Sequence, residues 1–429
     1  MVIHIVAPGE TLSGIAGQYG VPLSQLILDN APADPDRLAV GQALLIQFPA
    51  EFYTVRSGDT LASIALAHGL SVRALWRNNP ALGGSSVLYP GQRLVLSYRQ
   101  QKELRLSVCA YAYPSIDQQL LRSTVPFLTD TIPFTYGITP QGDLVYLNDL
   151  SVISMAQAGG SAPRMHLSTL TKDGNFSDEL AHIVLTDRAV QNRLIARILT
   201  VLSARDYRSL DVDFEYISAQ DAGAYADFIR RLAQRLNPLG YPVCVALAPK
   251  TAPDQKGQLY EGHDYAALGQ AANEVFLMTY EWGYTYGPPM AVAPLPQVRR
   301  VVEYALSVIP AEKIWLGIPN YGYSWPVPFR QGEMKAQSIS NQYAVSLAVG
   351  YGAQIRYSEQ DQAPYFRYTD ESGLTHEVWF EDVRSIRAKL MLVKEYGLRG
   401  AGYWNLMRPF AQNWQLLNAL CDIRDPLFD

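Results

Sequence analysis

Cysteine and long apolar runs are both scarce in this chain of 429 residues, and each absence excludes a class of protein. The three cysteines, Cys109, Cys244 and Cys421, are too widely separated to suggest a disulfide framework or a zinc-ligand cluster. The six histidines show no ligand spacing, so we expect no metal and no cofactor. No window is long and apolar enough to span a bilayer, and the first residues lack the basic and apolar regions of an export signal. We therefore expect a protein that does not insert into membranes and is made without a cleaved signal.

Positive charge is in deficit as well, because 35 Lys and Arg against 40 Asp and Glu leave a net charge of −5. Such a chain has no basic field to release counterions from phosphate, which argues against a nucleic-acid partner. Aromatic residues are plentiful in one kind, with 27 tyrosines and 7 tryptophans against 13 phenylalanines. Tyrosine and tryptophan combine a flat apolar face with a polar group, which suits stacking on sugar rings, although barrel cores and interfaces also use them. Composition thus favours a carbohydrate partner without requiring one.

The first hundred residues contain one pattern twice. I-V-A-P-G-E-T-L at 5–12 matches T-V-R-S-G-D-T-L at 54–61, and Asn30 and Asn79 follow at the same offset. Each copy predicts a short strand, a turn at glycine, a helix with threonine near its N-cap, a second helix that ends near the asparagine, and a closing strand.

This β-α-α-β arrangement resembles the LysM module, a binder of peptidoglycan and chitin, over residues 2–48 and 52–97. The resemblance implies that the turn after the glycine and the segment around the asparagine line a groove for N-acetylglucosamine units. A second interpretation is that these side chains only hold turns and helix caps. The residues concerned are Gly9, Thr11, Asn30, Gly58, Thr60 and Asn79.

Beyond a short polar link at 99–103, strand-like apolar runs alternate with helix-like stretches, and this alternation predicts an α/β fold. Eight alternations indicate a (β/α)8 TIM barrel over 104–429, in which catalytic groups lie at the C-terminal ends of the strands. The stretch at about 325–378 is too long for a simple crossover and predicts a small α+β insertion between strands 7 and 8. Helix candidates with apolar spacing of three and four include 188–203, 220–236 and 295–308. The strand candidates are 106–111, 134–138, 165–170, 211–217, 243–248, 274–280, 313–318 and 400–404.

The acidic stretch at 209–216 is the clearest sign of chemistry. Asp211, Asp213 and Glu215 alternate with apolar residues, so in an extended strand their carboxyl groups point to one face. Neighbours on that face lie ~6.6 Å apart, close enough for Asp213 to hydrogen-bond Glu215 and for the pair to hold a proton near neutral pH. A shared proton is a usable general acid. The alternative is an amphipathic edge strand with a solvated acidic face.

The barrel motifs resemble those of glycoside hydrolase family 18, the chitinase-type family. L-D-V-D-F-E at 210–215 matches the second half of its fourth-strand motif, D-G-x-D-x-D-x-E. M-T-Y-E at 278–281 resembles the M-x-Y-D of the sixth strand, and Trp404 matches the tryptophan of the eighth. Within that family, the pairing with LysM modules is most similar to bacterial spore cortex-lytic and spore-coat N-acetylglucosaminidases.

The resemblance implies a retaining mechanism in which the 2-acetamido group of the substrate is the nucleophile. Glu215 is then the general acid, and Asp213 orients the acetamide. Tyr280 hydrogen-bonds the acetamide oxygen, and Asp211 tunes Asp213 by like-charge repulsion. Core packing is the alternative role for Tyr280 and for Trp404. The residues assigned to substrate binding are Trp404, Glu281, Trp282, Tyr113 and Asn320.

Two positions depart from the family pattern. Arg208 and Ser209 stand where the leading Asp-Gly belongs, which removes a carboxylate that we expect only to support the strand. Glu281 replaces the usual aspartate, and this lengthens a side chain that touches substrate. We expect the second change to affect substrate preference and neither change to alter the chemistry.

The leading hypothesis is a glycosidase that cleaves β-1,4 bonds at N-acetylglucosamine in spore cortex peptidoglycan, tethered to the wall by its LysM modules. The missing export signal fits a protein deposited in the spore cortex or coat from the mother-cell cytoplasm. The expected partner is peptidoglycan or another N-acetylglucosamine polymer, and we expect a monomer. Two alternatives remain open: a chitinase-type hydrolase that acts on chitin oligomers, and a non-catalytic, lectin-like sugar-binding protein. Retention of Glu215 argues against the last, because loss of this acid is the usual route to inactivity.

Overall fold

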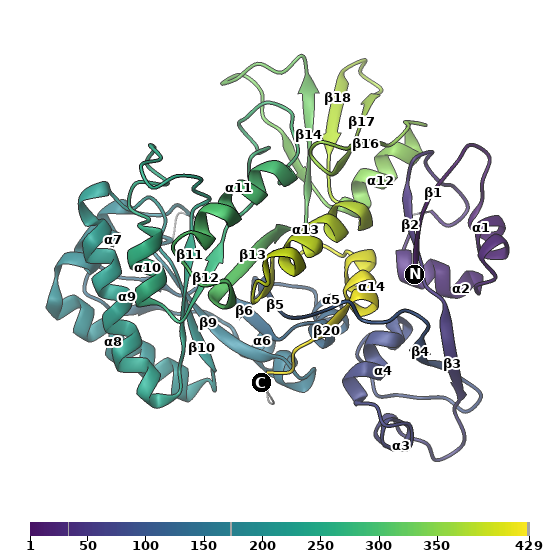
Figure 1. Ribbon diagram of the computed structural model, residues 1–429, viewed down its shortest axis with the longest axis horizontal. Coiled ribbons are helices and arrows are strands. Elements are labelled where there is room, and N and C mark those ends of the chain that lie inside the picture. Colours follow the sequence, from purple (N-terminus) through teal and green to yellow (C-terminus); the bar gives the residue numbers. More distant parts are fainter. Residues whose placement is uncertain (33, 172–173, 427–429) are drawn as a thin grey trace.

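The computed structural model describes residues 1–32, 34–171 and 174–426. Figure 1 shows three parts: two small N-terminal modules side by side, a barrel of parallel strands surrounded by helices, and a small antiparallel sheet that stands on the barrel. Within these ranges, none of the helices has the length and apolar character that a membrane crossing needs.

Each N-terminal module is a two-stranded antiparallel sheet covered by two helices. Leucine and isoleucine at matching helix positions fill the two cores, with Leu12 and Ile15 in the first module and Leu61 and Ile64 in the second. The predicted repeat is therefore also a structural repeat. Its elements are β1 (Val2–Ile5), α1 (Leu12–Tyr19), α2 (Leu23–Asn30) and β2 (Ala43–Ile46), then β3 (Pro49–Thr54), α3 (Leu61–Ala67), α4 (Val72–Asn78), η1 (Pro80–Leu82) and β4 (Arg93–Tyr98).

Eight parallel strands form the barrel, and the last pairs with the first to close it. These strands are rich in Val, Leu, Ile and Ala and are almost entirely buried, as expected for a parallel sheet that helices cover. The predicted TIM barrel is confirmed. In order around the barrel, its strands are β5 (Leu104–Ala112), β6 (Asp130–Pro133), β9 (Ala162–Ser168), β10 (Ser209–Asp213), β11 (Val243–Leu247), β12 (Glu274–Leu277), β13 (Ile314–Pro319) and β19 (Gly400–Trp404).

The helices ring the barrel on its outside (Figure 1). Three of them, α8, α9 and α11, occupy the stretches in which the sequence predicts helices. Helix α9 packs on strand β11, and its Tyr225 stacks on Phe214, the residue that follows β10, with ring centroids 5.7 Å apart. The helices are α5 (Gln118–Thr124), α6 (Leu150–Ala158), α7 (Asp178–Thr186), α8 (Arg188–Ala204), α9 (Ala222–Leu236), α10 (Tyr265–Ala271), α11 (Leu295–Leu306), α13 (Val383–Tyr396) and α14 (Ala411–Leu420). Shorter elements are η2 (Val125–Phe127), β7 (Gly137–Ile138), β8 (Leu144–Val145), η3 (Ala219–Asp221), η4 (Asn237–Leu239), η5 (Ala311–Lys313) and β20 (Cys421–Ile423).

Two of the predicted strands need correction. The second barrel strand is β6, which ends at Pro133, just before the predicted run at 134–138. It begins with a charged residue, Asp130, whose carboxylate accepts a 2.6 Å hydrogen bond from buried Arg164, so a buried strand starts without an apolar signal. The fourth strand, β10, ends at Asp213, so Glu215 lies two residues beyond the strand.

The insertion between β13 and β19 is a five-stranded antiparallel sheet with one helix, as the length of that connection predicts. It stands at the top of Figure 1, above the barrel and beside the first module. The sheet order is β15-β14-β18-β17-β16. Its elements are β14 (Gly322–Val327), β15 (Gln337–Ile339), α12 (Asn341–Gly350), β16 (Arg356–Ser358), β17 (Ala363–Thr369) and β18 (Thr375–Trp379).

Helix α14 of the barrel attaches to both modules, and it lies between them and the barrel in Figure 1. Gln412 Nε2 donates to Asn30 Oδ1 of the first module at 2.9 Å, and Asn418 Nδ2 donates to Asn78 Oδ1 of the second at 2.9 Å. Gln415 lies between them on the same helix face and donates to the backbone of the second module at 3.3 Å. Because residues three apart share a helix face, one row of amides holds both modules.

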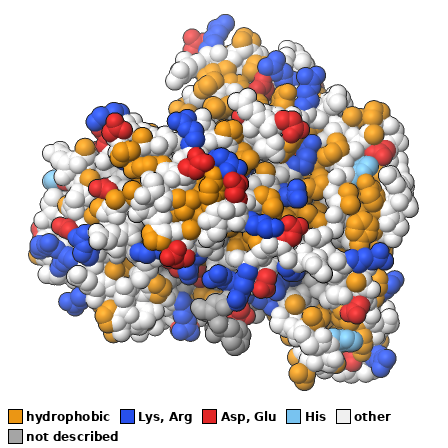
Figure 2. All heavy atoms as spheres, viewed as in Figure 1, with side chains coloured by type: hydrophobic (Ala, Val, Ile, Leu, Met, Phe, Trp, Pro, Cys, Tyr) orange, Lys and Arg blue, Asp and Glu red, His pale blue; other side chains and the backbone are white. Residues whose placement is uncertain are grey.

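The face of the molecule in Figure 2 carries Lys, Arg, Asp and Glu side chains interspersed with one another. A surface of mixed charge gives no extended attraction for a polyanion. On this face the charges follow the mixed composition of the chain, which has 35 Lys and Arg and 40 Asp and Glu.

Candidate active site

The acids of the 209–216 stretch lie at the C-terminal end of the barrel strands. Asp211 and Asp213 are buried residues of β10, and Glu215 follows in the loop as a half-buried residue. Tyr280 and Glu281 follow β12, and Trp404 ends β19. The structure therefore places these candidates on three strand ends of one barrel face, which is where barrel enzymes carry their catalytic groups.

Asp211 is the deepest of the three acids and is fully buried. Its Oδ2 accepts a 2.7 Å hydrogen bond from the hydroxyl of Tyr111 on β5. Its Oδ1 is buried and has no hydrogen-bond partner among the described residues, and the same holds for Asp213 Oδ1. The two aspartates thus form a buried acidic centre with few donors to stabilise negative charge.

Asp213 and Glu215 both hold protons more tightly than ordinary carboxyl groups. Burial, followed by the negative charges of Glu215 and Asp211, raises the pKa of Asp213 well above its usual range. Burial, followed by the charge of Glu281, raises the pKa of Glu215 to about 7. Because each ionised carboxyl disfavours ionisation of the other, the pair retains a proton near neutral pH. Such a pair can deliver a proton to a substrate.

Tyr280 lies among these acids. Burial, then the charge of Asp213 and those of Glu215 and Glu281, raises the pKa of the Tyr280 phenol well above its usual range. The phenol is therefore protonated at all physiological pH values and can act as a hydrogen-bond donor. Its position close to the acids favours a role in the site over simple core packing.

Glu281 follows β12, which is separated from β10 by the single strand β11, and is solvent-accessible. Its carboxylate accepts hydrogen bonds from the hydroxyls of Tyr321 and Tyr323, the latter at 3.1 and 3.2 Å. The surrounding protein partly desolvates the carboxylate and so raises the pKa of Glu281, and the two phenol hydrogen bonds partly offset this rise. Its backbone φ of 68° is rare for a residue with a side chain. The longer acid that replaces the family aspartate is thus held by tyrosines at the root of the insertion.

Aromatic rings gather next to the acids. The half-buried ring of Trp404 lies 4.8 Å from Phe134, 5.5 Å from Tyr111 and 6.2 Å from Tyr113, measured between ring centroids. Tyr113 is 36% exposed, so this cluster reaches from the acidic centre to the surface. Partly exposed aromatic faces of this kind can stack on a sugar ring.

Comparison with known families gives this geometry a context. Residues 163–408 match the glycosyl hydrolases family 18, and residues 4–47 and 53–97 match the LysM domain. The chain belongs to glycosyl hydrolase family 18. It is a family 18 glycosidase with two N-terminal LysM modules, here called LysM1 (residues 4–47) and LysM2 (residues 53–97).

Its relatives share the whole architecture. The chain is 40% identical over 424 residues to the cortical fragment-lytic enzyme of Bacillus subtilis (strain 168), with 97% of each chain covered. It superposes on the crystal structure of the Bacillus cereus spore cortex-lytic enzyme SleL with a TM-score of 0.84 at 37% identity, covering 99% of both chains. The corresponding enzyme of Bacillus megaterium QM B1551 gives a TM-score of 0.83 at 37% identity, covering 99% of this chain and 98% of that one.

His166 is a residue of the family 18 site that the sequence analysis missed. Its Nε2 lies 3.8 Å from Asp211 Oδ2 and 3.7 Å from Asp213 Oδ2. Burial lowers the pKa of His166 to about 4, so the ring is neutral at pH 7, and its Nδ1 lies 2.6 Å from Thr135 Oγ1. The available signal was a histidine inside the apolar third strand, where a polar residue needs a buried partner.

Tyr111, Tyr321 and Tyr323 were missed for a related reason. Tyr111 lies inside the first predicted strand, where an aromatic residue reads as core. Tyr321 and Tyr323 follow the seventh strand in the segment N-Y-G-Y-S-W at 320–325, and the density of aromatics there was the signal that could have found them.

Asn320 follows β13 and Trp282 lies in the loop after β12, and both make contacts within the protein. Asn320 is 1% exposed, and its Nδ2 donates to the backbone oxygens of Asn405 at 2.8 Å and Arg408 at 2.9 Å. It thereby braces the loop that follows Trp404. Trp282 is half-buried and packs against the barrel core. Contact of these two residues with substrate stays a prediction.

The candidate glycan-binding residues of the LysM modules fall into two groups. The turns of Gly9 and Gly58 are exposed, with φ of 82° and 89°. Asn30 and Asn79 are instead buried, and each amide bonds the backbone of its own module, for example to Leu45 and Val95. These asparagines hold the closing strand against the second helix.

The two threonines act as helix caps. Thr11 Oγ1 accepts from the backbone N–H of Gly14 at 3.1 Å, and Thr60 Oγ1 accepts from that of Ser63 at 3.0 Å. Both threonines are exposed, so the cap leaves one side of each hydroxyl open. The exposed turns with their threonines are the parts of these sets that can reach a ligand.

Proposed function

We propose that this protein is a spore cortex-lytic N-acetylglucosaminidase that hydrolyses β-1,4 bonds in peptidoglycan, with retention and with assistance from the substrate. The observation that carries the proposal is the buried Asp213–Glu215 pair beside Tyr280. The pair retains a proton near neutral pH, and burial with the charge of Glu281 raises the pKa of Glu215 to about 7. Support for the substrate comes from the LysM modules and from the cortex-lytic relatives, which cover nearly the whole chain. These relatives also support a location in the spore.

In the proposed reaction, Glu215 gives its proton to the glycosidic oxygen as the bond to C1 breaks. The carbonyl oxygen of the substrate's 2-acetamido group attacks C1 from the other face and forms a bicyclic oxazolinium ion. Asp213 accepts a hydrogen bond from the acetamide N–H and stabilises the charge on that nitrogen, while Tyr280 donates to the acetamide oxygen. A water molecule then opens the ring and returns a proton to Glu215, which gives net retention.

Neutral His166 and Tyr111 contact the buried aspartates of this centre. Tyr111 donates to Asp211 at 2.7 Å, and so it orients the acid that lies next to Asp213 on the strand face. The positive charge that forms on the acetamide nitrogen favours the ionised form of Asp213, whose pKa is otherwise raised by burial. The site is thereby more complementary to the charged intermediate than to the neutral substrate.

Matched glycosides that differ only at C2 test the mechanism. We expect turnover of the 2-acetamido compound and almost none of the 2-hydroxyl or 2-amino compounds, with tight competitive inhibition by a thiazoline analogue of the oxazolinium ion. Efficient turnover of a plain glucoside, or a covalent 2-fluoro sugar adduct on Asp211, Asp213 or Glu281, would contradict substrate assistance.

A second comparison tests the substrate. Chitin oligomers carry the same 2-acetamido group, so the mechanism alone does not distinguish chitin from peptidoglycan. Rates on cortex fragments and on chitin oligomers of equal length decide between them, and we expect the cortex fragments to be preferred. A preference for chitin would make the protein a chitinase-type hydrolase instead.

A further inference from the structure

LysM1 and LysM2 are built alike but belong to different hydrophobic cores. Among the described residues, the core of LysM2 consists of LysM2 side chains alone. LysM1 has a core of its own, but its Ala39 lies in the core of the insertion together with Ile355 and Phe366. Its Ala43 and Leu45 lie in the core of the barrel. LysM1 therefore shares hydrophobic cores with the barrel and the insertion, which together are called the catalytic unit here, and within the described part of the chain LysM2 shares neither core.

The turn before the closing strand shows this difference at equivalent positions. Gly41 of LysM1 and Gly91 of LysM2 have nearly the same backbone, with φ of 85° and 87°. A Cβ on Gly41 would overlap the carbonyl oxygen of Ile355, whereas a Cβ on Gly91 would meet nothing within 4 Å. Two residues earlier, Ala39 is 4% exposed and Tyr89 is 69% exposed. The same turn is covered in one repeat and open in the other.

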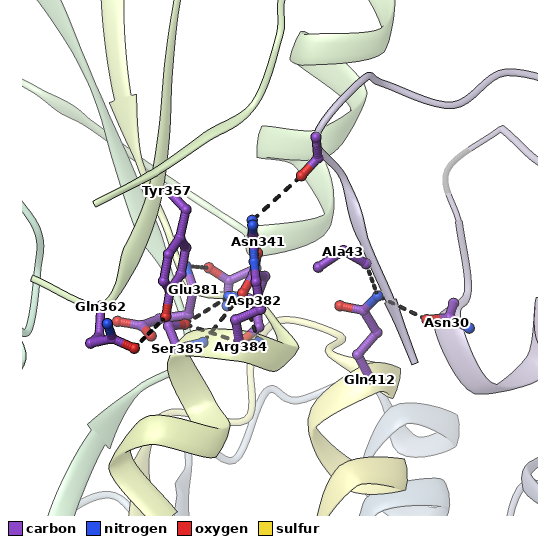
Figure 3. Close-up of polar contacts among 11 residues, drawn as sticks. Asn30, Ala43, Asn341, Tyr357, Gln362, Glu381, Asp382, Arg384, Ser385 and Gln412 are labelled. Carbon is purple, nitrogen blue, oxygen red and sulfur yellow. Dashed lines mark hydrogen bonds and ion pairs between the residues drawn. The ribbon is translucent and has the colours of Figure 1, made fainter. Parts of the chain in front are cut away.

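Polar contacts seal the junction of LysM1 with the catalytic unit. Figure 3 shows Gln412 of α14 between Asn30 and Ala43, and its amide donates to Asn30 Oδ1 at 2.9 Å and to the oxygen of Ala43 at 2.8 Å. From the insertion, Gln342 Nε2 donates to the oxygen of Ala31 at 2.7 Å. LysM1 is thus bonded both to the barrel and to the insertion.

A second group of contacts surrounds Gly41. The backbone N–H of Ile355 donates to the oxygen of Val40 at 2.9 Å, which joins the LysM1 turn to the start of β16. Arg384 lies next to Asp382 in Figure 3, and its Nη2 donates to Asp382 Oδ2 at 2.6 Å. The same Nη2 donates to the oxygen of Gly41 at 3.4 Å. These contacts fix the edge strand of the insertion sheet.

From that edge, one row of paired residues crosses the insertion sheet to the cleft. Arg356 of β16 pairs with Tyr365 of β17, Tyr365 pairs with Trp379 of β18, and Trp379 pairs with Tyr323 of β14. The rings of Tyr365 and Trp379 stack with centroids 4.6 Å apart. Tyr323 pairs in turn with Ser338 of β15, and its hydroxyl donates a hydrogen bond to Glu281 in the candidate active site. Strand β16, which contacts LysM1, and Tyr323, which contacts Glu281, therefore belong to one continuous hydrogen-bonded sheet.

LysM2 attaches through polar contacts, and the loop before its closing strand meets the barrel at Gly84 but is exposed further along. Arg73 inserts its guanidinium among backbone oxygens of the barrel, and bonds those of Pro126 at 2.7 Å and Gly160 at 2.8 Å. Its loop before the closing strand exposes Val87 by 59% and Tyr89 by 69%. An exposed tyrosine on a LysM module is suited to stack on an N-acetylglucosamine ring.

We propose that the two modules have divided their work: LysM1 is a clamp that positions the insertion sheet, and through it Glu281, at the cleft, while LysM2 carries the contact with glycan. This inference rests on the proposed function, since it assigns the binding of N-acetylglucosamine polymer to one module. It makes LysM1 a positioning device and LysM2 the tether.

The matched pair Gly41→Ala and Gly91→Ala tests the clamp. Both variants carry the same backbone strain at positive φ, but only Gly41→Ala pushes on Ile355. We expect kcat/KM on a small soluble N-acetylglucosaminide to fall by about tenfold to 10²-fold in Gly41→Ala, the cost of small misplacement in a site, and to stay unchanged in Gly91→Ala. Gln342→Ala removes a clamp contact without adding an atom and serves if Gly41→Ala does not fold.

The pH profile of kcat/KM shows whether Gly41→Ala loses activity because Glu281 is misplaced or because less of the protein is folded. Glu215 is faced by Glu281 and Tyr280, which follow β12, and by Asp213 at the end of β10. If the insertion moves Glu281 away, the pKa of Glu215 falls and the alkaline limb of activity moves to lower pH, because Glu215 works in its protonated form. A smaller folded fraction lowers the rate equally at every pH. Equal rates and equal pH profiles in both glycine variants would overturn the clamp.

Tyr89→Ala tests the tether. We expect binding to insoluble peptidoglycan to weaken by about tenfold, an affinity change of 1.4 kcal/mol, with unchanged turnover of the soluble substrate. Gly41→Ala should keep full wall binding. Undiminished binding in Tyr89→Ala, or loss of binding in Gly41→Ala, would contradict the division of work.

One measurement is independent of the proposed function. If the wild-type protein hydrolyses no N-acetylglucosaminide, the proposed function fails, but the clamp still predicts faster hydrogen exchange in β16, β17 and β18 of Gly41→Ala than of Gly91→Ala. Identical exchange in the two variants would reject the clamp by itself.

Discussion

The candidate active site has two sides, the ends of β10 and β12, and they hold their carboxylates in different ways. On the β10 side, Asp211 and Asp213 are buried in the barrel, each with one oxygen that has no partner among the described residues. On the other side, Glu281 is solvent-accessible and is held by the hydroxyls of Tyr321 and Tyr323. Burial raises the pKa of Asp213 on the first side and that of Glu281 on the second, where the two phenol hydrogen bonds partly offset the rise.

This difference separates two tasks. In the proposed mechanism the proton donor must be protonated near working pH, and the buried end of β10 favours this by withholding solvent and counter-charge from Asp213 and Glu215. A substrate contact must instead present a carboxylate to a polar ligand, and phenol donors favour that charged form. In the proposed mechanism the barrel therefore supplies the proton donor, and the insertion supplies the tyrosines that hold Glu281, whose position LysM1 can affect.

The largest expected effect comes from removing the proton on the barrel side. Glu215→Gln keeps the shape of the side chain but lacks an acidic proton, so we expect kcat to fall by ~10² or more with substrate binding retained. Single-turnover kinetics and binding of a thiazoline inhibitor measure the two quantities separately. Glu281→Gln is the control on the opposite side and should keep most of the activity; a comparable loss in both variants would erase the distinction between the two sides.

A smaller effect is expected from the aromatic floor between them. Trp404→Ala removes the ring that packs on Phe134 and Tyr111, so we expect KM for a soluble oligosaccharide to rise by about tenfold, as for the loss of one well-packed ring. Trp404→Phe keeps a ring in place and should recover most of the affinity. An unchanged KM in Trp404→Ala would assign this residue to the core of the barrel.

The barrel side could be predicted from the sequence because its signals are local. Asp211, Asp213 and Glu215 stand within five residues, and their spacing alone predicts that the three carboxyl groups lie close together. The repeat of LysM modules and the alternation of strands and helices are equally local patterns. What the spacing did not reveal is that β10 stops at Asp213, since Phe214 is as apolar as the strand residues before it.

The contacts that hold the acids could not be predicted, because they form only in three dimensions. Tyr321 and Tyr323 reach Glu281 from 40 and 42 residues away. His166 contacts Asp211 across neighbouring strands, and its neutral state depends on burial that no short motif reports. The contact of Gly41 with Ile355 joins parts of the chain more than 300 residues apart, and a positive φ needed for the turn would explain that glycine in both repeats.

The smallest expected effect is the most direct measure of how the two sides communicate. Glu281 is the largest charge contribution to the pKa of Glu215, which together with burial stands at about 7. Glu281→Gln removes that negative charge, so the pKa of Glu215 falls and less of the protonated acid is present at neutral pH. The alkaline limb of kcat/KM should therefore move to lower pH, with a loss of rate at pH 7 of less than about tenfold, which is the effect of one pKa unit. Tyr323→Phe removes one phenol donor from Glu281 but leaves its charge, so it should leave the limb closer to its wild-type position. A limb that stays in place in Glu281→Gln would mean that solvent screens this charge, and that burial on the barrel side alone sets the proton affinity of Glu215.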